Sequence, residues 1–453
     1  MSNNMLGTEN LRTEEHRGKR TENQDSENLK YREILEFIEE ENVEFIRLAY
    51  FDVFGKQKNI AIMPGELERA IKNGVSIDGS AVRGFGSDTR SDLFLHPDLS
   101  TLSIVPWRPT EGRVCRIFCD ICYPDGSMFE CDTRQMLKDA VREAASCGLT
   151  VKFGSEMEFY VFKRDEYGNV TDQPLDQAGY MDIEPLDGGE NLRRDICFAL
   201  VDMGITPESS HHEQGPGQME IDFRYSDPLT AADNTSTVKW AVRSICAAGG
   251  YAADFSPKPI ADKPGNGMHL NISVHSLNDH DTEKEAAKDA DNTGGESVQK
   301  AGTPDYTDVF MAGILKYIRE ITLFLNRAPS SYARLGQMEA PRYVSWAVQN
   351  RSQLIRIPAD PSGRRRIELR SPDPKANPYL AFSLLIYAGL EGVRKNMHPP
   401  LPMDINLFMA EAYVTDQLKR LPASIEEAEA LALDSSFVRR HVPEICLKAY
   451  LGQ

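Results

Sequence analysis

Acidic side chains recur on one face of the strands that the sequence predicts. In the stretch Phe153–Phe162, Glu156 and Glu158 alternate with the apolar residues Met157 and Phe159. Successive side chains of a strand point to opposite faces, so the two glutamates would share a face, about 7 Å apart. Carboxylates at that separation repel each other unless a cation lies between them. The pattern therefore predicts a strand that binds a metal.

Three further stretches repeat this alternation: Gln218–Phe223, His269–Val274 and Arg366–Arg370. One such strand alone is more often the solvated face of a sheet, and the recurrence is what favours a site. If the four strands are neighbours in a curved sheet, one cavity would hold Glu156, Glu158, Glu220, His269 and Glu368, with Arg366 and Arg370 at its edge. Oxygen ligands with one imidazole favour Mg²⁺ or Mn²⁺, and arginines beside them indicate a phosphorylated or carboxylated substrate.

The composition narrows the function classes. The chain has 453 residues, 41% hydrophobic and 26% charged, which is typical of a globular protein with more than one domain. Its 51 Lys and Arg against 69 Asp and Glu give a net charge of −18, which argues against nucleic acid as the main partner. No apolar run approaches the ~20 residues of a membrane span, and the polar N-terminus does not resemble a secretory signal. We therefore expect a cytoplasmic protein without a membrane partner.

The eight cysteines predict neither a disulfide framework nor a zinc site. Cys119 and Cys122 form a CxxC, but they lie in a predicted strand and would face opposite sides of it. No second CxxC or CxxH follows, as a zinc site would require. We expect the cysteines to be reduced.

The chain divides into segments of different character. Residues 1–28 have almost no apolar content and predict a disordered tail, and the charged residues 277–304 predict an exposed insertion. We expect a small β-rich domain over residues 29–127 and a larger one over 128–453. Helices in the larger domain are predicted at Thr133–Cys147, Leu192–Met203, Pro228–Ala252, Asp305–Leu325, Asn377–Arg394 and Ile425–Leu433.

Five sets of residues follow one another along the chain: Gly154–Phe159, Ser210–Ile221, Gly267–His269, Asn350–Ser352 with Ile355–Pro358, and Arg366–Arg370 followed by Asp373–Pro374 and Asn377–Leu380. Together they resemble glutamine synthetases of the bacterial type I class. The resemblance implies an α+β fold, with a β-grasp-like N-terminal domain and a catalytic domain in which helices back a curved antiparallel sheet. It also implies an ATP-dependent carbon–nitrogen ligase that joins L-glutamate and ammonia to L-glutamine through a γ-glutamyl phosphate intermediate.

The resemblance also implies roles for particular residues. Two divalent metals, Mg²⁺ or Mn²⁺, would flank the reacting phosphate, one held by Glu158, Glu213 and Glu220 and the other by Glu156, His269 and Glu368. Arg351, Arg356 and Arg366 would hold the phosphate. The substrate side would be formed by Gly265, Arg334 and Arg370, and the nucleotide side by Asn271 and Ser273. The sequence contains no GxxxxGK[ST] phosphate loop.

Two further acids match family positions. Glu339 resembles the glutamate of a flap that closes the site and helps to remove a proton from the amine. Asp52 resembles an aspartate that binds and deprotonates ammonium, and the family takes it from the neighbouring subunit. The site would then exist only in a homo-oligomer, which the resemblance implies to be a dodecamer of two six-membered rings. Without the resemblance, Asp52 could equally be a turn residue before Gly55.

The sequence departs from the family pattern near the amine pocket. Pro264 replaces an asparagine that contacts the bound glutamate, and proline has neither a side-chain amide nor a backbone N–H. The flap segment Arg334–Glu339 is shorter than usual. Three hypotheses therefore stay open: a glutamine synthetase, a ligase that joins glutamate to a larger, polyamine-type amine, and a catalytically silent assembly. Retention of the metal-ligand pattern and of Glu339 weighs against the third.

Overall fold

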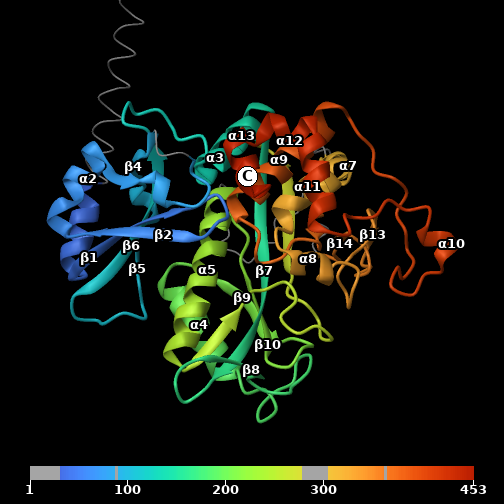
Figure 1. Ribbon diagram of the computed structural model, residues 1–453, viewed down its shortest axis with the longest axis horizontal. Coiled ribbons are helices and arrows are strands. Elements are labelled where there is room, and N and C mark those ends of the chain that lie inside the picture. The colour runs from blue at the N-terminus through green and yellow to red at the C-terminus, as the bar shows by residue number, and fades with distance from the viewer. Residues whose placement is uncertain (1–30, 87–89, 278–304, 362–364, 453) are drawn as a thin grey trace, which may run out of the picture. The chain divides into compact units, whose positions relative to one another are not determined.

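The computed structural model describes residues 31–86, 90–277, 305–361 and 365–452 (Figure 1). The tail predicted over 1–28, and all but the first residue of the insertion predicted over 277–304, lie outside these ranges. The described chain forms two compact units, and the smaller one consists of residues 31–50, 59–75 and 95–120. The larger unit holds the remainder, including the turn Phe51–Lys58. Within the described ranges, no helix has the length and apolar character needed to span a membrane.

A six-stranded sheet forms the N-terminal part of the fold, after a helix over residues 31–40. Its order is β2-β1-β6-β4-β3, with β5 paired to β6, and the central strands β1 and β6 run parallel. The middle of β6 is buried on both faces, as expected for a central strand. The strands are β1 (Val43–Phe51), β2 (Gln57–Ile62), β3 (Val75–Asp78), β4 (Asp92–Pro97), β5 (Ser103–Ile104) and β6 (Arg113–Cys122); helix α2 is Leu67–Asn73.

The four strands predicted to carry the site are consecutive neighbours in a nine-stranded sheet. They are β15 (Ile367–Leu369), β12 (Met268–Ser276), β7 (Leu149–Arg164) and β10 (Gln218–Phe223), and each pairs antiparallel with the next. This confirms the predicted antiparallel arrangement. Beyond β15 the sheet continues with β14 and β13, which form a parallel pair, and beyond β10 it continues with β9. Its remaining strands are β8 (Val170–Pro174), β9 (Pro207–His212), β11 (Tyr251–Asp254), β13 (Trp346–Val348) and β14 (Ile355–Ile357).

Helices cover the apolar face of this sheet. Helices α3 (Thr133–Ser146) and α5 (Pro228–Ala248) contact β7, and α9 (Pro378–Arg394) packs against both of them and against α7 (Thr307–Leu325) (Figure 1). On β7 the side chains of Met157, Phe159 and Val161 are fully buried, and Phe153 stacks on Phe382 with ring centroids 4.3 Å apart. The opposite face of the same strands is left for polar groups.

Capping residues explain where the helices begin. The Asp132 carboxylate accepts the Arg134 N–H at the start of α3, and the Asn377 side chain accepts the Tyr379 N–H at the start of α9. The helix predicted to reach Ala252 ends at Ala248, because Gly249 and Gly250 end it and β11 follows. The other helices are α4 (Glu190–Asp202), α8 (Pro329–Arg334), α10 (Ala412–Thr415), α11 (Ile425–Asp434), α12 (Ser436–His441) and α13 (Glu444–Tyr450).

One disulfide contradicts the expectation that all cysteines are reduced. Cys131 and Cys446 are bonded, with their Cα atoms 5.9 Å apart, whereas the other six cysteines are free. The two residues are 315 positions apart in the sequence, so no local spacing could have indicated the pair. The bond attaches α13 to the loop before α3.

Candidate active site

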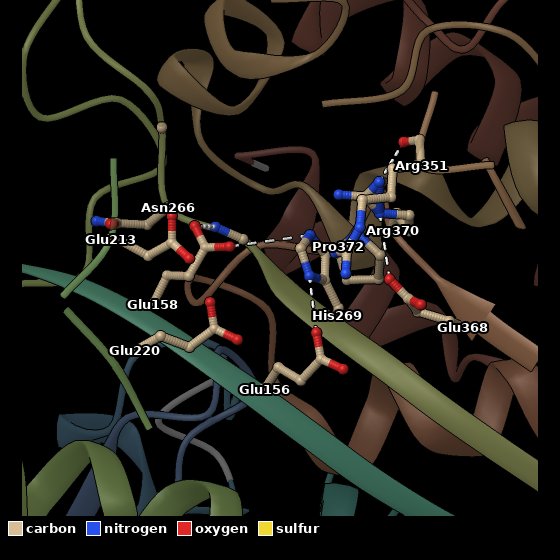
Figure 2. Close-up of polar contacts among 12 residues, drawn as sticks. Glu156, Glu158, Glu213, Glu220, Asn266, His269, Arg351, Glu368, Arg370 and Pro372 are labelled. Carbon is tan, nitrogen blue, oxygen red and sulfur yellow. Dashed lines mark hydrogen bonds and ion pairs between the residues drawn. The ribbon is translucent and has the colours of Figure 1, made fainter. Parts of the chain in front are cut away.

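The strand register places the predicted acidic residues opposite one another. Glu220 on β10 pairs directly with Glu158 on β7, and His269 on β12 pairs with Glu156. Figure 2 shows these side chains on one side of the sheet, with contacts from His269 to both Glu156 and Glu158. Next in the sheet, Glu368 on β15 lies opposite Asn271. Residues more than 200 positions apart in the sequence thus form one acidic cluster.

One predicted set of metal ligands comes together as a compact group. Glu156, His269 and Glu368 each offer an atom within 4.8 Å of the other two. The His269 Nδ1 lies 3.0 Å from a Glu156 oxygen. Burial opposes ionisation of Glu156, but hydrogen bonds to His269 and from Asn271 outweigh it and lower the pKa of this carboxyl to about 2. The charged carboxylate beside an imidazole is a suitable donor pair for a divalent cation.

A second compact group contains two of the three residues predicted for the other metal. Glu213 and Glu220 meet with His211, each offering an atom within 4.8 Å of the others, and the His211 Nε2 is 3.1 Å from Glu213. Glu158 lies between the two groups, with its Oε1 3.9 Å from the His269 Nε2. Its Oε2 accepts the N–H of Gly267 at 2.8 Å. Reasoning from the sequence had assigned no role to His211.

The electrostatics of the cluster fit a bound cation. Burial raises the pKa of Glu220 well above its usual range, and the charges of Glu158 and Asp222 raise it further. Burial likewise raises the pKa of Glu158. Several carboxylates concentrated in a buried space repel one another, and a divalent ion would relieve that repulsion. The donor set of carboxylate oxygens with imidazole nitrogens suits Mg²⁺ or Mn²⁺.

Two cavities meet at the acidic cluster. The larger, of about 910 Å³, contains the glutamates of the second metal group, and the smaller, of about 360 Å³, lies over β7 and β12. Both are lined by Glu156, Ser209 and Asp222. Two cavities thus share a wall where the carboxylates gather, an arrangement that could hold two substrates close together.

Comparison with known proteins decides the family. A family model described as glutamine synthetase, catalytic domain, matches residues 130–452, and one described as glutamine synthetase, beta-Grasp domain, matches residues 42–124. The chain belongs to the glutamine synthetase family. The family's members are ATP-dependent carbon–nitrogen ligases, and the two matches confirm the predicted β-grasp and catalytic folds.

Relatives match over most of their length. A glutamine synthetase of Methanosarcina mazei is 42% identical over 427 residues, which is 92% of each chain. One of Clostridium saccharobutylicum is 42% identical over 87% of each chain. A solved structure titled "GmaS/ADP complex-Conformation 1" superimposes with a TM-score of 0.79 at 25% identity, over 92% of this chain and 94% of the other. The family assignment therefore applies to both the N-terminal and the catalytic parts.

The arginines that the family resemblance named are divided between the cavities. Arg334, Arg351, Arg356 and Arg370 line the larger one, and Arg366 lines the smaller. Arg356 forms an ion pair with Glu368, and the Arg370 Nε lies 3.3 Å from the same carboxylate. Arg334 is 3% exposed and donates to the backbone carbonyls of the 370–372 segment. These hydrogen bonds fix the position of the guanidinium group and of its positive charge. They also use several of its N–H donors on backbone carbonyls.

The nucleotide-side residues and the flap also lie at the cavities. Asn271 and Ser273 line the smaller one, and the Arg366 Nε donates to Asn271 at 3.0 Å. Glu339 lines the larger one in a left-handed backbone conformation with φ of 69°. Glu339 therefore lies at the larger cavity in an uncommon backbone conformation.

The loop that contains Pro264 and Gly265 lines a cavity, whereas Asp52 does not. Pro264 and Gly265 line the larger cavity, and the Tyr160 hydroxyl donates to the Pro264 carbonyl at 2.7 Å. A Cβ on Gly265 would lie 2.3 Å from the Pro257 carbonyl oxygen, so only glycine fits there. Asp52 belongs to neither cavity lining.

Two further polar residues support the ligands, and sequence reasoning gave them no role. The Gln218 side chain donates to Glu158 at 3.3 Å and to the Gly265 carbonyl at 3.2 Å. The His212 Nδ1 lies 2.6 Å from the Glu213 carbonyl, and its Nε2 lies 2.9 Å from Asp176. Partners of this kind orient metal ligands. Gln218 was detectable because it shares the polar face of its strand with Glu220.

Proposed function

We propose that this chain catalyses the ATP-dependent ligation of L-glutamate and ammonia to L-glutamine. The supporting observation is the meeting of two cavities at one acidic cluster, at Glu156, Ser209 and Asp222. ATP in the smaller cavity would present its terminal phosphate there, and glutamate in the larger cavity would approach from the other side. A γ-carboxylate oxygen attacks the terminal phosphorus, the bond to ADP breaks, and γ-glutamyl phosphate forms.

The second step consumes ammonia. The nitrogen attacks the γ-carbonyl carbon, the bond between that carbon and the phosphate oxygen breaks, and one proton must leave the nitrogen. Glu339 is the proposed acceptor of that proton, since it lines the larger cavity. Asp52 is the proposed binding and deprotonating group for ammonium, supplied by the neighbouring subunit of a homo-oligomer, which we propose to be a dodecamer in the cytoplasm.

The charged side chains divide the work of binding. Two Mg²⁺ or Mn²⁺ ions, when bound, would neutralise charge at the transferred phosphate. One would be held by Glu156, His269 and Glu368, and the other by Glu158, Glu213 and Glu220, with His211 beside them. Arg351 and Arg356 would hold the phosphate. The nucleotide would be held by Arg366, Asn271 and Ser273. The amino acid would be held by Gly265, Arg334 and Arg370.

A larger amine is the second candidate acceptor, because of the lining around Glu339. Pro264 stands in that lining where it can offer no amide, and Tyr180, Met181 and Met338 add apolar surface to the same cavity. Half or more of each of the side chains Tyr180, Met181 and Met338 is exposed. Such a surface could accommodate the carbon chain of a polyamine-type substrate.

Phosphate release distinguishes these functions. The protein is incubated with ATP, Mg²⁺ and glutamate, and release is measured with ammonium and then with a panel of amines that includes putrescine. We expect release with ammonium. Phosphate release with putrescine but not with ammonium would contradict glutamine synthesis and support the ligase for larger amines. No release with any amine would contradict both enzyme functions and support a catalytically silent assembly. A Glu220→Gln variant is the control, because it removes a proposed metal ligand and should abolish turnover while the protein stays folded.

A further inference from the structure

The turn that carries Asp52 is held in one conformation. The Asp52 Oδ1 accepts the N–H groups of Phe54 at 3.0 Å and of Lys56 at 2.9 Å. Gly55 adopts φ of +74°, and a Cβ there would lie 2.9 Å from the Asn377 Cα. Burial raises the pKa of the Asp52 carboxyl, against the opposing effect of its backbone hydrogen bonds. A proton acceptor of raised basicity is thus fixed on a turn that tolerates no other residue at position 55.

The carbonyl next to Asp52 receives two side-chain donors from distant parts of the chain. The Asn377 Nδ2 donates to the Val53 oxygen at 3.0 Å, and the Tyr450 hydroxyl donates to the same oxygen at 3.1 Å. A carbonyl oxygen has two lone pairs, so both are occupied. Asn377 begins α9, and Tyr450 is the last residue of α13. The turn is therefore bonded to two helices at one atom.

Helix α13 is itself firmly attached. Cys446 is bonded to Cys131 and is completely buried. The Tyr450 ring packs on Phe54 with centroids 5.1 Å apart and on Phe324 at 4.9 Å. Burial raises the pKa of Tyr450, and the charge of Asp52 contributes to this rise, so the hydroxyl lies within electrostatic reach of that carboxylate. Tyr450 thus contacts the turn through both its ring and its hydroxyl.

We propose that Tyr450 is a positioning residue for Asp52, which it holds in place through the Val53 carbonyl. This inference rests on the proposed role of Asp52 in binding and deprotonating ammonium. Removal of the hydroxyl frees one lone pair of the Val53 oxygen and lets the turn shift, while the ring contact with Phe54 remains. Helix α13 would then help to form the ammonium site of a neighbouring subunit.

The test compares two amines in the Tyr450→Phe variant of the full-length protein. Ammonium must be bound and deprotonated, whereas hydroxylamine is already neutral at pH 7 and does not need that step. We expect the KM for ammonium to rise by no more than about tenfold, because the effect is indirect and the energy of one neutral hydrogen bond is its upper bound, with little change in kcat. The kinetic constants with hydroxylamine should stay near those of the wild type. An equal loss with both amines would indicate a purely structural effect and overturn the inference.

Two further variants complete the experiment. Tyr317→Phe removes another buried hydroxyl, one that lies 3.4 Å from Glu391, and should leave both amines unaffected. In an Asp52→Asn background, Tyr450→Phe should add nothing, because a residue that acts through Asp52 has no effect once Asp52 is changed. If the two substitutions cause additive losses of activity with ammonium, the inference is contradicted. It is also contradicted if Tyr450→Phe has wild-type kinetics with ammonium while Asp52→Asn is impaired. If Asp52→Asn itself keeps the wild-type KM for ammonium, the proposed role of Asp52 is wrong, which is a separate result.

Discussion

Glu158 and Glu220 are direct cross-strand partners, although like charges in that position destabilise a sheet. The proposed divalent ion would relieve this repulsion. We predict that Glu220→Gln raises the melting temperature of the metal-free protein by about 1 °C, because about 1 kcal/mol of lost repulsion is divided by the large unfolding entropy of a chain of this size. Thermal unfolding with and without Mg²⁺ or Mn²⁺ measures the effect.

The same variant should also lose most of the stabilisation by metal that the wild type shows, since a ligand that binds only the folded state raises its stability. Glu190→Gln, an exposed change at the start of α4, is the matched control and should respond to metal as the wild type does. A Glu220→Gln protein that is less stable than the wild type without metal, and that responds to metal equally, would contradict the assignment.

Most residues of the acidic cluster could be predicted from the sequence because they alternate with apolar residues. The alternation places Glu156, Glu158 and Glu220 on one face of their strands, whatever the order of the strands. His211 could not be assigned to the cluster from the sequence, because its neighbours in Pro207–His212 are nearly all polar and no apolar face marks the strand. The bonding of Arg334 to backbone carbonyls was equally invisible, since it depends on how a distant segment folds back.

Helices α7 and α9 pack with almost no space between their backbones, at positions occupied by glycine. A Cβ on Gly313 of α7 would lie 2.1 Å from the Ala388 carbonyl oxygen of α9, and one on Gly392 would lie 2.1 Å from the Val309 oxygen. Backbone atoms cannot move aside as a side chain would. We predict that Gly313→Ala lowers the free energy of unfolding by about 1–3 kcal/mol, despite the better helix propensity of alanine.

Denaturant unfolding checks this prediction, and Gly65→Ala is the control. A Cβ on Gly65 would meet nothing within 4 Å, so we expect a change of no more than about 0.5 kcal/mol. Equal stabilities of the two variants would mean that α7 and α9 are not in such close contact.

At the level of elements, long periodic segments with capping signals were predictable and short ones were not. The predicted segments of α3, α7 and α9 agree with the structure to within two residues at each end, because Asp132 and Asn377 mark two of the starts and apolar residues recur along each helix. The three-residue strands β13 and β14 carry too few residues to show a period. Helices α12 and α13 are short in the same way, so the contact of Tyr450 with Val53 could not be foreseen.

For the whole molecule, the fold class came from the resemblance rather than from composition or periodicity. Alternation predicts strands but not their order, and residues such as Glu158 and Glu220 meet only because β10 returns beside β7. The Cys131–Cys446 bond shows the same limit, since 315 residues separate its ends. Assembly is a further step, because the contacts between subunits lie outside a single chain.

Asp52 lines neither cavity of its own chain, which fits a site completed by a second subunit. Mixed assemblies test this arrangement. Asp52→Asn and Arg351→Ala should each keep only a small, measurable fraction of the wild-type activity with ammonium, because one removes the proposed ammonium-binding acid and the other a proposed phosphate-binding arginine. If the two residues of a site come from different subunits, random 1:1 mixing leaves about a quarter of the sites intact, and activity returns to about that fraction. If both come from one chain, every site keeps a defect and no activity returns. A mixture of wild type with the double variant is the control, since it should retain about a quarter of the activity for a shared site and about half for a site within one chain.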